Sequence, residues 1–445
     1  MRDIDLADYI ADKYPENGWE PIGNTVENED YDLLTYGING EYDGNNHKIT
    51  NLTQTITESY NSGLFGNFFG SIKGLTISNA VIIIDNDEGC LGAGVLAGTI
   101  SDNETFAKFL EAQTGSSDGR MSAINPEFVT DCAVENSTLN IKNTTNYAGL
   151  LCGKCTSTCL KNVKVSGNLT FENTDFVFAG GLAGDLSAVY ILEDCESNCS
   201  TNIEGCEFYT YGGFIGNIKL FDNLVDGRTA NYLRNISKGS IAVNNSNIYA
   251  EYLFGGHIGG FIGYANNDHA FNDSGFEYCS SLVNIEANNL TLHFSEYSYS
   301  PSCIAGFIGT SKADEGSPVD MIFREIQLKN CSYQGNITLS QLNSDVPDYW
   351  TSFIIGGLVG NPSSIVCMNC SAQGNYTCDF ESGSAYVGGF SGTSCYGESC
   401  SLTCQLKARV QSPYTLDIGT TCAYSWGIDW ELVDPVDNST ILPWD

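Results

Sequence analysis

The feature that most constrains this chain is a glycine-framed block that recurs nine times along its 445 residues. Each copy places Leu or Phe two residues before a closing glycine. Four of the spacings between copies are 31 or 32 residues, and the other four range from 46 to 55. The closing glycines are Gly66, Gly98, Gly153, Gly184, Gly216, Gly263, Gly309, Gly360 and Gly392. A base period near 31 residues with insertions is typical of a stacked-repeat protein.

Each repeat reads as two or three short strands. Residues 163–171 alternate apolar and polar side chains, the period of a half-buried strand. A second pattern, Asn-Cys-Ser-x-Gln-Gly-Asn-x-Thr, occurs at 330–338 and 369–377, and 162–170 fits the same frame with Val163 in the cysteine position. Asn and Gly at the corners indicate residues with positive φ. Stacking the Leu/Phe column from repeat to repeat would give a continuous core.

These patterns predict an all-β fold, a right-handed parallel β-helix of about ten rungs. With rungs about 4.8 Å apart, the rod would be about 50 Å long. A β-sandwich or a propeller is the alternative, but propeller blades have a longer period and aromatic signatures that are missing here. We expect the β-helix over 1–405, a C-terminal capping segment over 406–445, and loop insertions near 101–130, 217–255, 264–300, 310–328 and 340–352.

The start of the chain resembles a known family. The strings Asp3-Ile4-Asp5-Leu6, Trp19-Glu20-Pro21-Ile22-Gly23-Asn24, the run 40–52 and Gly63-Leu64-Phe65-Gly66 are similar to the GLUG-motif repeat family. The resemblance extends to about residue 400. It implies a surface or secreted, adhesin-like β-helix, of a kind also found beside bacterial immunoglobulin-protease domains.

The first residues are already inside the first rung of that pattern. We expect a strand followed by an irregular turn over 3–14, rather than a short amphipathic helix with Leu6, Tyr9 and Ile10 on one face. No signal-like segment precedes them, so we expect that the native chain extends upstream or that a signal was removed.

Composition limits the partners. The formal net charge is −35, from 19 Lys and Arg against 54 Asp and Glu. Such a surface repels nucleic acid and anionic membranes, and no stretch approaches the length of a membrane span. We therefore expect no nucleic-acid partner and no membrane span, but self-association or contacts with other surface proteins and glycans.

Cysteine usage points outside the cytosol. The chain has 18 cysteines, an even number, many of them clustered. They are interpreted mainly as disulfides that clip corners and insertions, with buried thiols as the alternative. Cys331 and Cys370 occupy the same column of successive rungs, at a spacing that a disulfide can bridge. A zinc site at Cys152, Cys155 and Cys159 lacks a clean four-ligand set.

A second signal agrees with this compartment. The chain contains 15 Asn-x-Ser/Thr sequons, which mark glycan-accepting surface positions in secreted proteins. The alternative is that Asn and Thr simply suit the corners and strands of a β-helix. The predicted acceptors are Asn51, Asn103, Asn136, Asn143, Asn168, Asn198, Asn235, Asn244, Asn272, Asn289, Asn330, Asn336, Asn369, Asn375 and Asn438.

Signals for catalysis are thin. None of the four histidines sits in a metal or nucleophile motif, and His257 is expected beside a corner. The densest acidic group is Asp429, Glu431, Asp434 and Asp437, which we interpret as part of the cap with Trp426, Trp430 and Trp444. We expect no cofactor. Asp85, Asp87 and Glu88 form a weak Ca²⁺ candidate, with a solvated acidic loop as the plainer interpretation.

These observations favour a non-enzymatic, secreted or cell-surface structural or adhesive protein. Its rod would present loops and glycans at fixed spacing, and its ends could stack into a filament. A carbohydrate-active β-helix enzyme (a polysaccharide lyase or hydrolase) is the alternative, and the non-catalytic stalk of a larger protease-like surface protein is a third possibility.

Overall fold

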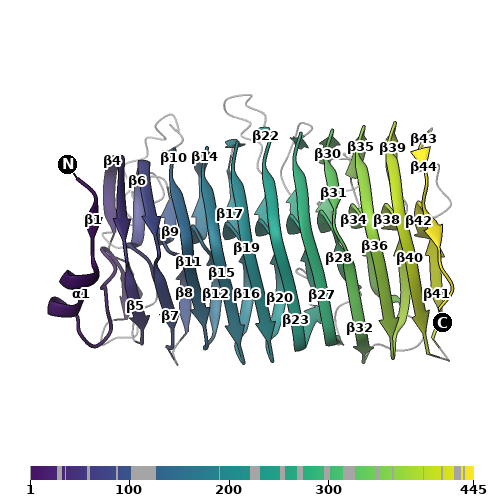
Figure 1. Ribbon diagram of the computed structural model, residues 1–445, viewed down its shortest axis with the longest axis horizontal. Coiled ribbons are helices and arrows are strands. Elements are labelled where there is room, and N and C mark those ends of the chain that lie inside the picture. Colours follow the sequence, from purple (N-terminus) through teal and green to yellow (C-terminus); the bar gives the residue numbers. More distant parts are fainter. Residues whose placement is uncertain are drawn as a thin grey trace, which may run out of the picture.

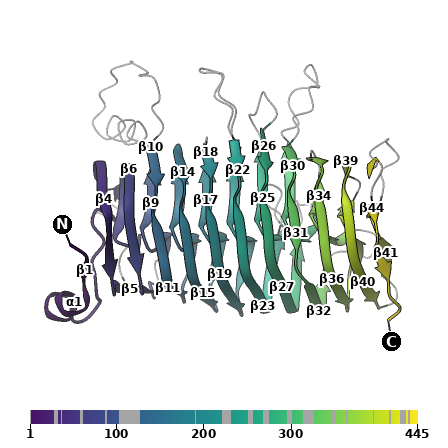
Figure 2. The ribbon, with the colours of Figure 1, turned by 45° about the horizontal axis from the view of Figure 1, so that its top comes forward.

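The alternation of apolar and polar residues gives each strand one apolar face. Stacking of successive repeats buries these faces in a common core. The computed structural model is a parallel β-helix, with 45 strands and one helix in its described part. Figures 1 and 2 show the strands side by side along one rod, with the two termini at opposite ends. The described residues are 2–27, 33–35, 37–57, 61–86, 89–101, 127–189, 191–220, 231–250, 256–267, 274–294, 301–313, 326–345, 351–362, 365–393, 395–411, 414–424, 432–433 and 436–444.

Each full rung passes through four strands, which we number as ladders 1 to 4 in chain order. The pairing within every ladder is parallel. Ladder 1 contains β8 (Cys90–Ala93), β12 (Thr145–Gly149), β16 (Asp175–Gly180), β20 (Glu207–Gly212), β24 (His257–Gly259), β28 (Ser302–Ala305), β33 (Thr351–Gly356), β37 (Ser384–Gly388) and β41 (Leu416–Gly419). Ladder 2 contains β9 (Ala97–Ser101), β13 (Cys152–Thr156), β17 (Ala183–Ser187), β21 (Ile215–Lys219), β25 (Ile262–Asn267), β29 (Ile308–Ala313), β34 (Val359–Pro362), β38 (Ser391–Thr393) and β42 (Cys422–Tyr424).

Ladder 3 is made of short strands, and ladder 4 carries the longest ones. Ladder 3 contains β10 (Glu127–Thr130), β14 (Thr158–Lys161), β18 (Ile191–Glu193), β22 (Asn231–Leu233), β26 (Ser274–Glu277), β30 (Ile326–Lys329), β35 (Ile365–Met368), β39 (Tyr396–Glu398) and β43 (Leu432–Val433). Ladder 4 contains β4 (Ile38–Thr50), β6 (Phe65–Ser78), β11 (Ala133–Ile141), β15 (Lys164–Glu172), β19 (Glu196–Glu204), β23 (Ile236–Ala250), β27 (Ser280–Phe294), β31 (Ser332–Gln334), β32 (Ile337–Ser344), β36 (Ser371–Phe380), β40 (Ser401–Val410), β44 (Val436–Asp437) and β45 (Thr440–Ile441).

The remaining elements lie near the N-terminus. They are β1 (Ile4–Asp5), α1 (Ala7–Lys13), β2 (Thr25–Glu27), β3 (Leu33–Thr35), β5 (Thr53–Ile56) and β7 (Val81–Ile84). β1 adds to β4, β5 pairs with β7, and β2 and β3 form an antiparallel pair. Ladders 1 to 3 each contain nine separate described strands, and the long strand β6 also pairs with β9 of ladder 2 and β10 of ladder 3. This agrees with the predicted count of about ten rungs.

The glycine block forms the corner between ladders 1 and 2. Its Leu/Phe column points inward, and all nine members are at most 4% exposed: Leu64, Leu96, Leu151, Leu182, Phe214, Phe261, Phe307, Leu358 and Phe390. A Cβ on Gly213 would lie 2.2 Å from the carbonyl oxygen of Gly260 on the next rung, and a Cβ on Gly260 would lie 2.1 Å from that of Gly306. These glycines are therefore required by the close approach of stacked backbones.

Positive φ occurs at a different corner from the one that the glycines suggested. A glycine precedes the Leu/Phe column in seven of the nine copies, and six of these glycines have ordinary φ, whereas Gly63 has a φ of 114°. The corner between ladders 3 and 4 is left-handed in eight described rungs. Its members have φ between 51° and 56°: Asp131, Asn162, Asp194, Arg234, Tyr278, Asn330, Asn369 and Ser399. The prediction of positive φ was thus right for the Asn corners and wrong for the glycine block as a whole.

The predicted loop insertions include residues that form strands. Residues 231–250 and 274–294, expected in loops, contain β22, β23, β26 and β27. The glycine block marks only one corner of each rung. A long spacing between two blocks therefore looks like a loop insertion even where it contains strands of ladders 3 and 4. The boundary at 405/406 falls inside β40, and β41 pairs with β37, so the described C-terminal strands continue the ladders.

The N-terminal expectation was wrong in part. β1 is present, but the helix α1 follows it in place of an irregular turn. Leu6 and Ile10 are 7% and 5% exposed, and they cover the first rung. The Asp5 carboxylate accepts the Ala7 N–H at 3.0 Å. The end of a solenoid exposes its core, and the spacing of Leu6 and Ile10 by four residues lets one helical turn cover it.

Candidate functional site

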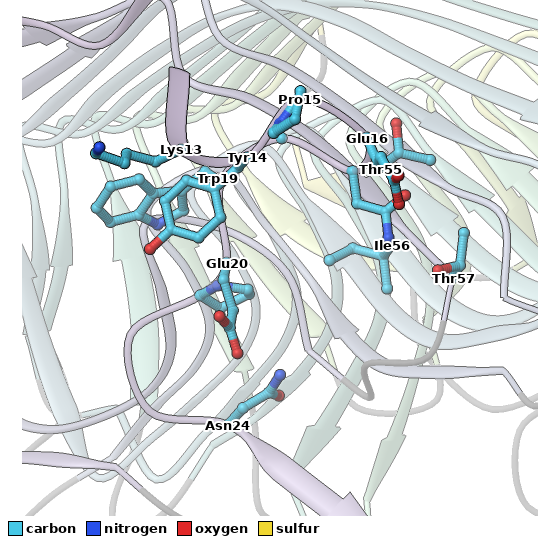
Figure 3. Close-up of a pocket in the computed structure, with 13 residues that line it drawn as sticks. Lys13, Tyr14, Pro15, Glu16, Trp19, Glu20, Asn24, Thr55, Ile56 and Thr57 are labelled. Atoms are coloured by element: carbon cyan, nitrogen blue, oxygen red, sulfur yellow. The ribbon is translucent and has the colours of Figure 1, made fainter. Parts of the chain in front are cut away.

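A pocket of about 490 Å³ lies beside the N-terminal helix. Tyr14 and Trp19 line one side of it, and Thr55, Ile56 and Thr57 line the other (Figure 3). Sequence reasoning had assigned no function to these residues. Two carboxylates, Glu16 and Glu20, complete a lining that combines aromatic and acidic groups.

Aromatic packing holds this pocket in shape. The Trp19 indole donates a hydrogen bond to the Leu64 carbonyl oxygen at 3.2 Å. Tyr14 lies edge-on to Trp19 with ring centroids 6.2 Å apart, and Tyr9 contacts both rings. The Gln54 amide donates to the Trp19 carbonyl oxygen at 2.7 Å. These contacts anchor the rings to the first rung, so the pocket is part of the end cover of the rod.

The predicted glycan acceptors lie mostly on the outside of the rod. Eight of them are exposed: Asn136, Asn168, Asn198, Asn289, Asn336, Asn369, Asn375 and Asn438. Four are partly exposed: Asn51, Asn143, Asn244 and Asn330. Asn103 and Asn272 lie outside the described residues. Most of the exposed acceptors are on the outward face of ladder 4, where Asn336 and Asn375 are in register on adjacent rungs and Asn168 lies further along the same column.

Asn235 is the exception, and its assignment as an acceptor was wrong. It is fully buried, and its side-chain oxygen accepts the Cys195 N–H at 3.0 Å. Its amide donates to the Leu192 carbonyl oxygen at 2.7 Å. A glycan on this side chain is incompatible with the fold, because Asn235 takes the inward corner position that cysteine takes on neighbouring rungs.

Six cysteines occupy the same inward corner position as Asn235: Cys132, Cys195, Cys279, Cys331, Cys370 and Cys400. None of the 18, all of which the structure describes, forms a disulfide, and 17 are buried. The Ser371 N–H bonds the Cys331 carbonyl oxygen, and the Ser401 N–H bonds that of Cys370, which confirms that Cys331 and Cys370 share a column. The structure holds both as thiols. Buried thiols here fill space as small apolar groups.

The described residues contain only part of the predicted Ca²⁺ candidate. Asp85 accepts a hydrogen bond from the Asn143 amide at 3.1 Å, whereas Asp87 and Glu88 lie outside the described residues. Within the described ranges, no group of three or more His, Cys, Asp or Glu side chains is placed to hold a metal ion, and this includes Cys152, Cys155 and Cys159.

The acidic and histidine candidates are also placed. Of the predicted C-terminal cap, five residues lie outside the described part of the chain: Trp426, Asp429, Trp430, Glu431 and Asp434. Asp437 is exposed. The Trp444 ring lies against the Lys407 and Arg409 side chains. His257 is buried in β24 beside the glycine corner, as expected, and stacks on Tyr264 at 5.8 Å. Burial lowers the pKa of His257 to about 3, so the ring is neutral at physiological pH.

One carboxylate is buried, and burial can raise a carboxyl pKa into the range of a general acid. Asp185 is the only Asp or Glu among the buried residues of the described chain. It accepts hydrogen bonds from the Asn217 amide at 2.6 Å and the Ser187 hydroxyl at 2.9 Å, with the Lys154 Nζ 3.9 Å away. Burial raises the pKa of Asp185 despite these partners. Glycoside hydrolysis ordinarily uses two carboxyl groups, and Asp185 has no second buried one in the described residues.

Comparison with known proteins adds no relative. No protein-family model, curated protein or solved structure matches this chain. No helix in the described part of the chain has both the length and the apolar character needed to cross a bilayer.

Proposed function

We propose that this protein is a secreted or cell-surface structural and adhesive rod of the GLUG-motif repeat type. The observation that carries the proposal is the set of exposed acceptor asparagines on the outward face of ladder 4. Asn168, Asn336 and Asn375 share one register position on three different rungs, and Asn198 lies in a neighbouring column of the same face. A rigid ladder with rungs about 4.8 Å apart presents whatever it carries at fixed spacing, which suits adhesion or a surface coat.

The two ends of the rod differ. α1 and the Tyr9, Tyr14 and Trp19 rings cover the first rung. At the other end, Ile441 is 49% exposed, although its register partner Leu406 on the preceding rung is buried. An inward position left uncovered on a terminal rung supports end-to-end association, which would bury it. Association would be heterologous, since the covered first rung and the exposed last rung are different surfaces.

The proposal is tested on protein taken from its native source. Glycopeptide mapping should find N-glycans on exposed acceptors such as Asn198 and Asn375, and none on Asn235. Electron microscopy of the same sample should show rods that associate end to end. Unmodified asparagines together with an intracellular location would overturn the proposal. Glycosylated rods that never associate would remove only the filament.

A carbohydrate-active enzyme remains the alternative, and Asp185 is the observation on which it would rest. The test is cleavage of neutral and acidic polysaccharides by the whole protein, followed by the Asp185→Asn variant. Cleavage that disappears in this variant would replace the structural proposal. No cleavage on any substrate would remove the alternative.

A further inference from the structure

A shallow groove of about 480 Å³ crosses three consecutive rungs on the outward face of ladder 4. It lies over β27, β31, the two residues that follow β31, and β36, which are neighbours in the rod (Figure 1). Its lining is the Gln-Gly-Asn triplet of two rungs together with Leu282 and Asn284 of a third. The sequence repeats this triplet at 334–336 and 373–375, but sequence reasoning did not assign it a function.

Bare backbone forms the middle of this lining. A Cβ on Gly374 would lie 1.7 Å from the Gly335 carbonyl oxygen, and a Cβ on Gly335 would lie 2.3 Å from that of Val283. Neither position accepts a side chain, and the register partners Val283 and Cys404 point inward at 1% exposure, so the surface between the flanking amides is backbone. The Gly335 N–H already donates to the Gln373 carbonyl oxygen at 3.1 Å. Since the ladder uses this backbone, the groove is unsuited to adding a peptide strand.

Two rows of amides flank the glycines. Gln334 pairs with Gln373 in register, and neither side chain bonds another described residue. On the other side, the Asn284 side-chain oxygen accepts the Asn336 N–H at 2.9 Å, and the Asn336 oxygen accepts the Asn375 N–H at 3.1 Å. The asparagines are thereby fixed in orientation. Within the described chain, the amide nitrogens of Asn284 and Asn336 remain available to a ligand.

None of the described residues that line the groove is charged, although the chain as a whole carries a net charge of −35. An anionic ligand would be repelled by the surrounding protein, and a cation would find no carboxylate in the lining. Primary amides supply both donors and acceptors, which suits hydroxyl groups. Leu282, 40% exposed at one end of the groove, adds an apolar surface.

We propose that this groove binds a neutral oligosaccharide laid parallel to the rod axis. The flanking amides repeat once per rung, about every 4.8 Å, which is close to the length of one sugar ring. Successive rings of a chain would then meet equivalent amides on successive rungs. The proposal specifies what the adhesive surface would hold, and to that extent it rests on the proposed function.

The sugar has two possible sources with the same chemistry. Asn336 and Asn375 are themselves sequon asparagines, so the protein's own N-glycans could lie in the groove. Alternatively, the ligand is a separate glycan. Thr338→Ala and Thr377→Ala remove both sequons and leave the asparagine amides in place, which separates the two sources.

The first arm uses the full chain made in a host that does not attach N-glycans. Calorimetric titration with cello-, manno- and chitooligosaccharides should show binding of at least one series. The Gln334→Ala/Gln373→Ala double variant should bind about tenfold more weakly, because two amide hydrogen bonds are lost. Asn202→Ala is the matched control, since Asn202 is an exposed amide on ladder 4 outside the groove, and it should leave affinity unchanged. No binding of any series, or equal binding by the double variant, overturns the proposal.

The second arm uses protein from the native source. If N-glycans occupy Asn336 or Asn375, this protein should bind the same oligosaccharide more weakly than the Thr338→Ala/Thr377→Ala variant does. Equal binding by the two proteins, with glycans present at these asparagines, would contradict the groove assignment. If the native protein binds the oligosaccharide but is neither secreted nor glycosylated in its source, the proposed function alone is overturned. Absent binding by a glycosylated surface rod would overturn this inference alone.

Discussion

The rings of Phe261 and Phe307 lie parallel to within 1°, with centroids 4.6 Å apart on adjacent rungs. Phe214 continues the stack below Phe261 at 4.7 Å. This spacing is the rung spacing, so the geometry of the ladder brings the rings into contact. Stacked aromatics of this kind contribute beyond their buried area.

Phe261→Ala should destabilise the fold by about 3–5 kcal/mol, because it leaves a cavity between two stacked rings. Phe261→Leu should cost less, since other rungs already place Leu in this column. Urea unfolding followed by circular dichroism measures both. Phe128→Ala, at a side chain that is 37% exposed, is the comparison. Equal losses for Phe261→Ala and Phe128→Ala would show that the column is not a packed core.

Asn235→Ala should cost about 1–3 kcal/mol, because the Cys195 N–H and the Leu192 carbonyl oxygen lose their partners in a buried site. Asn198→Ala, at an exposed acceptor, should change stability little. Thermal unfolding of the two variants in parallel checks this. A stability unaffected by Asn235→Ala would mean that water reaches the corner.

The buried cysteines should resist alkylation in the native protein. Burial raises the pKa of Cys90, Cys199 and Cys303 to about 12, and the thiolate is the reactive form. Iodoacetamide at pH 8 should therefore label Cys422, which is partly exposed, before the others. Peptide mass mapping over time follows each site, and denaturant should make all sites reactive. Rapid labelling of Cys303 in the folded chain would contradict this burial.

The Sγ atoms of Cys367 and Cys395 lie 3.7 Å apart, so a small movement of the side chains would bring them to disulfide-bonding distance. We expect this pair to give the first disulfide when the protein is treated with a thiol oxidant such as diamide. Cys367→Ser should abolish that species in non-reducing peptide maps, whereas Cys378→Ser should leave it in place. A first disulfide between Cys331 and Cys370 would favour the pairing expected from the column alone.

His257 predicts a pH dependence of stability. The unfolded imidazole titrates near 6.5, and the folded one has a pKa of about 3. Between these values only the unfolded chain binds the proton, so the stability present above pH 6.5 is lost as pH falls towards 3. The slope should be about 1.4 kcal/mol per pH unit.

The His257→Gln variant should lack this slope, because Gln does not titrate. Urea unfolding at several pH values between 3 and 7 gives the comparison, and the slope decides the outcome even if the variant is less stable overall. His293→Gln, at a partly exposed histidine that pairs with Asp345, is the control. A slope that persists in His257→Gln would assign the acid sensitivity to other groups.

Much of the fold was predictable from local pattern. The recurring Leu/Phe position predicted the inward column, and Phe214 to Phe390 lie in it as expected. The shared frame of residues 162–170, 330–338 and 369–377 predicted that Cys331 and Cys370 would align, as their register shows. These features repeat at fixed positions because every rung must present the same face to its neighbour.

The candidate sites were less predictable. The sequon at Asn235 looks like the others, yet its side chain lies in the core, because the direction of a corner side chain depends on its place in the rung. The N-terminal pocket joins residues 13–24 to 55–57, which only stacking brings together. The amide groove needs Gln334 and Gln373 on adjacent rungs and bare glycine between the rows.

By itself, the sequence determined the repeat, its β character and its inward column, because these follow from the spacing of apolar residues and glycines along the chain. The tertiary structure alone decided which asparagines face solvent, which thiols approach one another and where a helix covers the first rung. Those properties depend on the register between rungs and on the direction of side chains at the corners, and residues 30 to 60 positions apart in the chain set both.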